Sequence, residues 1–385
     1  MPGAYKLIIF FSVEYIFDLS LLGSIASWQS IAQVFGFFTA IGWCSLILVR
    51  IPKAESQQER INNYNSLLSM GILTLITLSI PIYAIGTCFS SNYQALQVLA
   101  WLLAWTLYQM PRHYFIALKN YRTALKVDAS ILAASLACLL TVSGHHVSTA
   151  LASCMAIVGA SASVAIQLDS AKKKLSLSYE KKGLEYGLIN LLSGGITLSL
   201  IPLAHYFSGS EFAGSISLFL ATIGIALLIP RAISTYHLPE LSKAIKNANL
   251  LKLRIKSMQR EISLSNLLTT AFNLLCATFI SFQSSAAIQG CMLFVTLSLI
   301  TLQNSIAIQG LVYSNILMIY EETKKTIKIN ILSSALYIAS CLAVLVLESG
   351  YSFLSACIAA LLIYILRLIK IKKLAIKKYD SYPAV

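Results

Sequence analysis

The stretch SLLSMGILTLITLSIPIYAIGTCF, residues Ser66–Phe89, decides the fold because it is apolar and contains no charged residue. A hydrocarbon core of roughly 30 Å requires about 20 apolar residues in a helix, so this stretch predicts a membrane-spanning helix. Three cations, Arg50, Lys53 and Arg60, precede it, whereas the short gap that follows, Ser90–Tyr93, contains no Lys or Arg. The two ends of the predicted helix therefore differ in charge.

Similar apolar stretches repeat along the whole chain of 385 residues, which is 57% hydrophobic and only 11% charged. This composition excludes a soluble domain with an ordinary surface. The runs of Leu, Ile and Ala are continuous, which favours helices over the alternating strands of a membrane barrel. We predict an all-α polytopic protein with spans at Ser24–Val49, Ser66–Phe89, Gln94–Met110, Ala129–Val142, Thr149–Leu168, Leu184–Ala204, Phe212–Ile229, Leu264–Phe282, Ile288–Gln309, Ile329–Leu347 and Ser352–Leu366. Leu7–Leu22 is a further candidate, which makes about 12, possibly 11, helices.

Of the 29 Lys and Arg residues, all except Lys6 lie in every second gap between these spans or in the C-terminal tail. The positive-inside rule predicts that the charged gaps and the C-terminus are cytoplasmic, in a multi-pass protein of the bacterial inner membrane. Lys6 obeys the rule only if Leu7–Leu22 spans the membrane. The net charge of +14 is explained by topology and by anionic membrane lipid, so no nucleic-acid partner is predicted.

The chain divides into two halves at a basic loop that contains Lys172, Lys173, Lys174, Lys181 and Lys182. With the first candidate helix included, each half has six spans, and both halves enter the membrane in the same orientation. Parallel repeats of this kind occur in transporters that carry their substrate between the halves. We predict an N-terminal lobe at 1–175 and a C-terminal lobe at 176–385 with a basic cytoplasmic tail.

Two segments resemble a known family. They are the run from Gly187-Leu188-Ile189-Asn190 to Pro202-Leu203-Ala204-His205-Tyr206-Phe207-Ser208-Gly209, followed by Gly214, and the segment from Gln109-Met110-Pro111-Arg112 to Asp128. Both are similar to the polysaccharide-exporter branch of the multidrug, oligosaccharidyl-lipid and polysaccharide exporter superfamily, which includes the O-antigen flippases. The segment Val13–Phe17 also resembles the outer link between helices one and two of that family. This alignment implies that most of helix one lies outside the sequence.

The resemblance implies two six-helix lobes in a V-shaped arrangement. It also implies alternating-access transport of undecaprenyl-diphosphate-linked oligosaccharide, an O-antigen or related repeat unit, from the cytoplasmic to the periplasmic leaflet. Such a protein is a transporter with no cofactor, not an enzyme. Its partners are the lipid-linked oligosaccharide, anionic lipid, and a polymerase and chain-length regulator of the same pathway.

A polar seam is required to carry a glycan across hydrocarbon, and residues three, four and seven apart lie on one helix face. Such a face is predicted at Tyr186, Asn190, Ser193 and Thr197, and further seam residues are Gln33, Asn273 and Gln303. Amides and hydroxyls both donate and accept hydrogen bonds, as sugar hydroxyls do. The alternative is that these side chains only bond neighbouring helices together.

Binding of the diphosphate is predicted at the cytoplasmic mouth, because no Lys or Arg lies at mid-depth in the clear spans. Arg112, Arg122 and Arg231 each follow the end of a span, and guanidinium groups bind phosphate oxygens in pairs. The alternative is that these arginines are ordinary topology charges.

Glu14 and Asp18 lie four residues apart and share a face if Leu7–Leu22 is a helix. A carboxylate at bilayer depth is costly, and the resemblance implies that an acid on the first helix binds the coupling ion. The alternative is a solvated outer loop. No His, Cys or acidic pattern predicts a metal site. The amphipathic stretch Leu238–Ile262 predicts a helix along the inner membrane surface.

Two rival functions share these sequence features. A cation-coupled multidrug antiporter belongs to the same superfamily and would have the same span pattern. A membrane glycosyltransferase or polymerase is the other rival. Such enzymes usually carry a sizeable outer loop with catalytic polar groups, and the gaps without Lys or Arg are all short.

Overall fold

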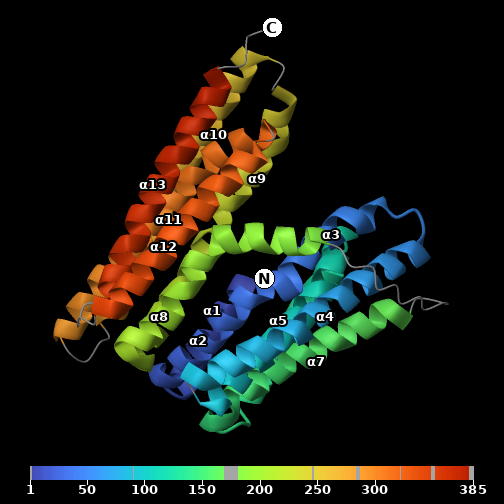
Figure 1. Ribbon diagram of the computed structural model, residues 1–385, viewed down its shortest axis with the longest axis vertical. Coiled ribbons are helices and arrows are strands. Elements are labelled where there is room, and N and C mark those ends of the chain that lie inside the picture. Colours follow the sequence, from blue (N-terminus) through green and yellow to red (C-terminus); the bar gives the residue numbers. More distant parts are fainter. Residues whose placement is uncertain are drawn as a thin grey trace. The chain divides into compact units, whose positions relative to one another are not determined.

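The computed structural model describes residues 2–89, 91–168, 181–244, 247–282, 287–320, 322–347 and 352–380. Every regular element in these residues is a helix (Figure 1). The chain forms two compact units, Met1–Ser217 and Leu218–Val385. The predicted lobe boundary at residue 175 falls in 169–180, outside the described residues, and stays a prediction together with the V-shaped arrangement.

The first unit contains seven α-helices and the larger part of an eighth. They are α1 (Pro2–Ile16), α2 (Leu19–Gly36), α3 (Gly42–Arg50), α4 (Gln57–Phe89), α5 (Asn92–Ala117), α6 (Tyr121–Leu139), α7 (Val147–Leu168) and α8 (Lys181–Ala226), with a π-helix η1 (Phe37–Ile41) and short 3-10 turns η2 (Ile51–Lys53) and η3 (Gly144–His146). Because η1 joins α2 to α3 without a break, residues Leu19–Arg50 run as one long helix.

The second unit contains the end of α8 and five long helices. They are α9 (Leu228–Ala244), α10 (Ala248–Phe282), α11 (Ala287–Ile319), α12 (Thr323–Leu347) and α13 (Ser352–Asp380). Helix α11 packs against α10 and α13, and α12 packs against α13.

The predicted spans are present. Among the described residues, 8 helices are long and apolar enough to cross a membrane. Helix α8 covers two predicted spans, Leu184–Ala204 and Phe212–Ile229, and breaks between them at Gly209, whose φ is 85°. A side chain rarely adopts this left-handed conformation, so glycine permits the turn. The prediction of an all-helical polytopic membrane protein with about twelve spans is confirmed.

The boundaries predicted for the first helix are wrong. Helix α1 ends at Ile16, and Asp18 caps α2 by accepting a hydrogen bond from the backbone N–H of Leu21 at 2.6 Å. A carboxylate at this position satisfies one of the free N–H groups of a helix start, which favours a break over a continuous helix. Glu14 and Asp18 therefore share no helix face.

The interfacial helix predicted at Leu238–Ile262 is also wrong. Helix α9 extends the preceding span to Ala244, and α10 begins at Ala248 and runs without interruption into the next span. The apolar side of this segment packs inside the second unit, where Met258 and Ile262 are buried with Val312 and Ile371. The same periodicity that suits a membrane surface also suits the surface of a helix bundle.

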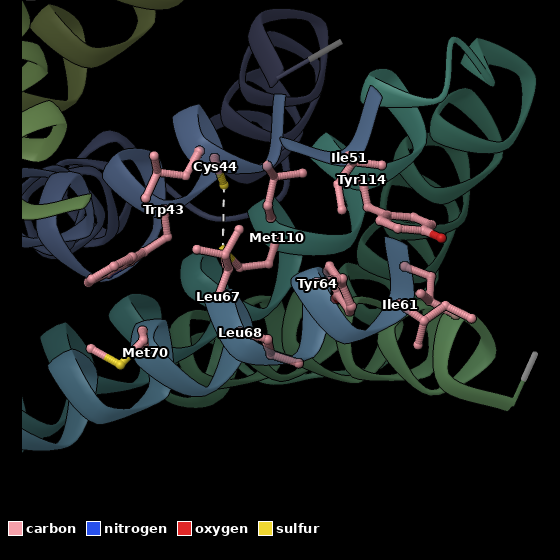
Figure 2. Packing of buried hydrophobic residues seen from close by; sticks show 13 residues of the cluster. Trp43, Cys44, Ile51, Ile61, Tyr64, Leu67, Leu68, Met70, Met110 and Tyr114 are labelled. Carbon is pink, nitrogen blue, oxygen red and sulfur yellow. Dashed lines mark hydrogen bonds between the residues drawn. The ribbon is translucent and has the colours of Figure 1, made fainter. Parts of the chain in front are cut away.

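Figure 2 shows a buried cluster of the first unit, where α3, α4 and α5 meet. Trp43 and Tyr64 are completely buried, and the Cys44 thiol lies 3.6 Å from the Met110 sulfur. The Tyr64 hydroxyl lies 2.8 Å from that of Ser163 on α7. Because lipid tails are as apolar as these side chains, close packing and such polar links hold the cluster together more than hydrophobic transfer does.

Gly159 sets the distance between α5 and α7. A Cβ atom built on Gly159 would lie 2.7 Å from the backbone carbonyl of Leu107 and from the backbone nitrogen of Tyr108. Helix backbone cannot move away as the end of a flexible side chain can. The two helices approach this closely only because residue 159 has no side chain.

We expect Gly159→Ala to lower the thermal stability of the detergent-purified protein, because the new methyl group forces α5 and α7 apart. Overpacking of this kind costs about 1–3 kcal/mol. Gly224→Ala is the matched control, since a Cβ there meets nothing within 4 Å and alanine favours the helix. Equal melting temperatures for the two variants would refute this account of the contact.

Glu322 joins two helices of the second unit. It lies just before α12, its carboxylate accepts a hydrogen bond from Lys378 near the end of α13, and it pairs with Lys325 at 3.2 Å. The hydrogen bond from Lys378 holds the pKa of the Glu322 carboxyl below its usual value of 4.5, and Lys325 adds to this effect.

A carboxyl whose pKa is lower in the folded protein stabilises the fold above its unfolded pKa, and this stabilisation is lost as the pH falls through the folded pKa. We therefore expect the protection of the end of α13 against hydrogen exchange, relative to the intrinsic rate at each pH, to decrease only below about pH 4.5. Glu322→Gln should produce fast exchange there at pH 7. Glu185→Gln, which removes an exposed pair with Lys181, should have no effect on exchange in its own helix. Slow exchange at the end of α13 in Glu322→Gln would contradict the link.

Candidate functional site

A polar pocket lies inside the first unit, enclosed by helices from both ends of its sequence. It is lined by Tyr5 and Lys6 of α1, Gln29 of α2, Trp105 and Tyr108 of α5, Asp128 and Ile131 of α6, and Met155 of α7. Both formal charges in this lining, on Lys6 and Asp128, lie within an otherwise apolar helix bundle. A cluster of this kind inside a membrane-spanning unit is a candidate functional site.

Lys6 lies at the middle of the unit. Its ammonium donates a hydrogen bond to Oε1 of Gln33 at 2.9 Å, and Gln33 is buried. Gln33 belongs to the continuous helix Leu19–Arg50, roughly 21 Å from the start of a helix about 48 Å long at 1.5 Å per residue. Among the described residues no carboxylate forms an ion pair with Lys6. The ammonium therefore lies beside the middle of this long helix, with a neutral partner.

Asp128 is buried and compensated. Its Oδ1 accepts hydrogen bonds from the Tyr108 hydroxyl at 2.7 Å and from Nε of Arg112 at 3.1 Å, and its Oδ2 lies 3.3 Å from the same Nε. The Asp128 side chain is 6% exposed and that of Arg112 is 15% exposed. A carboxylate in such surroundings requires a charged partner and good hydrogen bonds. Arg112 and Tyr108 supply both.

Several polar atoms near Lys6 have no partner among the described residues. They are Oε1 of Gln29, Nε2 of Gln33 and Nε1 of Trp105. The first helix is fixed beside them by a buried contact of 3.1 Å between the Tyr5 and Ser135 hydroxyls. Buried polar atoms are normally satisfied, so unpaired ones indicate water or a ligand.

The charged groups and the unpaired atoms together determine which kind of ligand the pocket favours. The charges of Asp128 and Arg112 cancel, which leaves the pocket with the positive charge of Lys6. Two of the three unpaired atoms, Nε2 of Gln33 and Nε1 of Trp105, are donors. The free space is about the size of one water molecule, so the pocket as it stands holds no larger ligand, and its charge favours an anion only if the helices around it move apart. No group of His, Cys, Asp and Glu suited to a metal ion occurs in the residues that the structure describes.

The predicted seam on α8 is partly visible. Tyr186 and Thr197 are exposed in the structure, and the Asn190 amide donates to the Tyr186 carbonyl at 2.9 Å within the same helix. The side chain of Ser193 lies outside the described residues. Tyr186, Asn190 and Thr197 lie along one side of α8. Their role as a substrate seam stays a prediction.

The three predicted phosphate-binding arginines have different environments. Arg112 pairs with Asp128, as described above. Arg122 is exposed in the first turn of α6, and Arg231 is exposed on α9 in the second unit. Arg122 and Arg231 stay predicted ligands at the cytoplasmic mouth. Arg112 has the additional structural task of balancing Asp128.

The remaining predicted residues are divided between the units. Gln33 is the hydrogen-bond acceptor of Lys6. In the second unit Asn273 on α10 and Gln303 on α11 are buried, and both polar atoms of Asn273 and Oε1 of Gln303 lack partners among the described residues. Glu14 lies in the last turns of α1 and Asp18 in the turn after it. A role for these acids in ion coupling stays a prediction.

Sequence reasoning missed Lys6, Tyr108 and Trp105 as site residues. One signal could have identified Lys6, because it is the single cation that depends on a doubtful helix to obey the charge rule. A charge that breaks a topological pattern is a candidate for a position inside the membrane. Tyr108 and Trp105 carry no comparable signal, since an aromatic residue in a membrane helix is usually a packing residue.

The fold resembles that of known membrane transporters. An inward-facing multidrug resistance MATE family transporter of the MOP superfamily matches with a TM-score of 0.71 and 12% identity over 99% of this chain and 96% of that chain. The lipid II flippase MurJ, in an inward closed conformation, matches with a TM-score of 0.67 and 14% identity over 99% and 91%. A MOP superfamily transporter from Pyrococcus furiosus, reported with a binding pocket of reverse polarity, matches with a TM-score of 0.56 and 12% identity over 98% and 93%. No family profile and no curated protein matches the sequence.

The protein is therefore a multi-pass membrane protein with the fold of MOP superfamily transporters. Within that fold it resembles both a multidrug transporter and a lipid II flippase along nearly its whole length.

Proposed function

We propose that this protein is a flippase that moves undecaprenyl-diphosphate-linked oligosaccharide across the bacterial inner membrane, from the cytoplasmic to the periplasmic leaflet. The proposed orientation places the C-terminus in the cytoplasm. The glycan is an O-antigen or a related repeat unit, and a polymerase and a chain-length regulator act after it. The fold is compatible with this function, because a lipid II flippase shares it over 99% of this chain.

The observation that carries the proposal is the charge of the pocket in the first unit. Lys6 has a neutral partner at 2.9 Å, while Asp128 is balanced by Arg112. In a medium of low dielectric constant, an uncompensated ammonium repels an organic cation and attracts a phosphate. In the lining of the pocket, Nε1 of Trp105 is an unpaired donor and Oε1 of Gln29 an unpaired acceptor, and Nε2 of Gln33, which bonds Lys6 through its other amide atom, is a further unpaired donor nearby. An anionic headgroup is therefore the substrate class that this pocket favours.

The polar face of α8 supports the glycan part of the proposal. Tyr186, Asn190 and Thr197 are uncharged and lie on one helix face, because adjacent members are four and seven positions apart. Neutral amides and hydroxyls match the donors and acceptors of sugar hydroxyls. The face would accompany the glycan while Lys6 attracts the diphosphate.

Transport by the purified protein in liposomes tests the proposal. A lipid-diphosphate oligosaccharide with a fluorescent sugar is placed in both leaflets, and an added reagent that cannot cross the membrane bleaches the outer pool. Protein-dependent bleaching of the inner pool is the expected result. A parallel set of liposomes contains a fluorescent organic cation. Movement of the cation alone would refute the proposal and favour the second candidate, a cation-coupled multidrug antiporter. The likeness of the fold to a MATE transporter, with a TM-score of 0.71, supports this second candidate.

A further inference from the structure

Helix α10 is longer than a membrane requires. Its 35 residues extend roughly 52 Å at 1.5 Å per residue, whereas the hydrocarbon core is about 30 Å thick. Helix α10 packs against α11 and α9 in the second unit (Figure 1). One end of α10 therefore projects beyond the hydrocarbon.

The exposed side chains of α10 identify the projecting end. From Leu264 to Phe282 the outer face is apolar, with Leu267, Leu275 and Phe279 each more than 60% exposed. This part is roughly 27 Å long, which matches the hydrocarbon thickness. Before Leu264 the exposed residues change to a mixture of cations and leucines. The projecting end is the N-terminal part, residues 248–263.

This N-terminal part of α10, which we name the basic tip, contains four cations and one acid. Lys252, Arg254, Lys256 and Arg260 are exposed, and the acid, Glu261, already accepts hydrogen bonds from His237 and Ser257 at 3.0 Å each. Leu250 is 43% exposed and Leu253 66% exposed between these cations. The tip is therefore both cationic and partly apolar on its outer face.

If α10 runs along the membrane normal with Phe282 at the hydrocarbon edge, the basic tip lies too far out to rest on lipid. Leu253 is roughly 43 Å and Leu250 roughly 48 Å from Phe282 along the helix. The hydrocarbon core and one headgroup layer together are only about 36 Å thick. Two exposed leucines at this distance face water unless a protein covers them. Lipid therefore does not account for the leucines.

The basic tip is also a preformed surface. Its inner side is fixed in the core of the second unit by Leu251 and Met258, which are 2% and 0% exposed. The amide of Asn315 on α11 donates to the Ser234 hydroxyl at 3.0 Å and lies 3.6 Å from the sulfur of Met258. On the opposite side Leu253, Lys256 and Arg260, at offsets of three and seven residues, lie on one face. A rigid face loses little entropy when a partner binds.

We propose that the basic tip of α10 docks a cytosolic protein that presents an acidic surface with a shallow apolar patch. Charge complementarity selects this partner, because the four cations of the tip exceed its single, hydrogen-bonded acid. The exposed leucines supply the apolar contact at the centre of the interface, and the surrounding cations steer association. The proposal uses the orientation given under the proposed function, but not the identity of the transported substrate.

Photocrosslinking in living cells tests the docking surface. The photoreactive amino acid p-benzoylphenylalanine is introduced at Leu253 or, as a matched control, at Leu268, which has a similar exposure of 63% but lies in the lipid-facing part of α10. The variant at 253 is expected to form a discrete adduct with a protein that mass spectrometry identifies as acidic, and the variant at 268 is expected to form none. In the background of Lys252→Glu and Lys256→Glu, the adduct at 253 should fall roughly fivefold or more, because like charges then face each other.

A second experiment, with labelled lipid, tests the alternative that the basic tip binds the membrane and not a protein. The protein with a fluorescent amino acid at 253 or 268 is placed in nanodiscs of phosphatidylglycerol and phosphatidylcholine whose acyl chains carry a nitroxide label. Quenching at 268 without quenching at 253 is expected. Quenching at 253 would overturn the proposal. So would an adduct at 253 whose amount is unchanged in the background of Lys252→Glu and Lys256→Glu. Docking and transport are read separately, so loss of one does not imply loss of the other.

Discussion

Lys6→Met is expected to reduce transport of a lipid-diphosphate oligosaccharide at least about tenfold in liposomes. Methionine keeps the length and apolar stem of lysine but removes the charge next to Gln33. A hydrogen bond to a charged group is worth about 1.5–3 kcal/mol, and each 1.4 kcal/mol corresponds to a factor of ten. The substrate therefore loses the strongest attraction that the pocket offers. Initial transport rates at several substrate densities measure the effect.

Two controls keep this result interpretable. Lys6→Arg retains the positive charge and should retain a larger part of the activity than Lys6→Met. Lys126→Met removes an exposed cation of the same unit and should leave the rate unchanged. Lys6→Met should also fold, since replacement of a partly buried charge by an apolar residue is often neutral or stabilising. A wild-type transport rate in a well-folded Lys6→Met protein would exclude the pocket from recognition of the anion.

Asp128→Ala is expected to lower the free energy of unfolding by about 3–5 kcal/mol, because the change leaves the partly buried guanidinium of Arg112 without its counter-charge. The Tyr108 hydroxyl also loses its acceptor at 2.7 Å. Thermal unfolding of the protein in detergent, followed by tryptophan fluorescence, should show a large decrease in the apparent melting temperature.

A double-mutant cycle separates the pair from its surroundings. In Asp128→Ala with Arg112→Met no unpaired charge remains, and the double variant should be more stable than Asp128→Ala alone. The exposed pair of Lys181 and Glu185 provides the comparison, since removal of either partner should change stability by less than about 1 kcal/mol. Additive effects of the two changes at 112 and 128 would show that the residues do not depend on each other.

The helical architecture was predictable because the membrane constrains it strongly. A span such as Ser66–Phe89 has no alternative in lipid. The absence of Lys and Arg from alternate gaps predicts the direction of each span, and this direction stays a prediction. The break at Gly209 also falls in a predicted gap between two spans. These features depend on composition along the chain, which a single sequence displays directly.

Features that depend on contacts between helices were not predictable. The pairing of Arg112 with Asp128 joins α5 to α6, and the contact of Lys6 with Gln33 joins α1 to α2, so neither has a periodic pattern within one helix. The segment Leu238–Ile262 shows the same difficulty. Its apolar stripe predicts a buried face. Whether lipid or other helices cover this face depends on where α11 and α13 lie, and in the structure these helices cover it.

If the long helix Leu19–Arg50 crosses the membrane with Gln33 at its centre, Lys6 lies near mid-depth, and this position has an electrical consequence. A cation halfway through the bilayer experiences about half of the membrane voltage, and a full crossing of 100 mV is worth about 2.3 kcal/mol per elementary charge. A substrate with two negative charges that reaches Lys6 from a negatively polarised cytoplasm therefore gains about 2 kcal/mol from the voltage alone. The respiratory voltage of the cell would then favour outward movement of the headgroup before any coupling ion is considered.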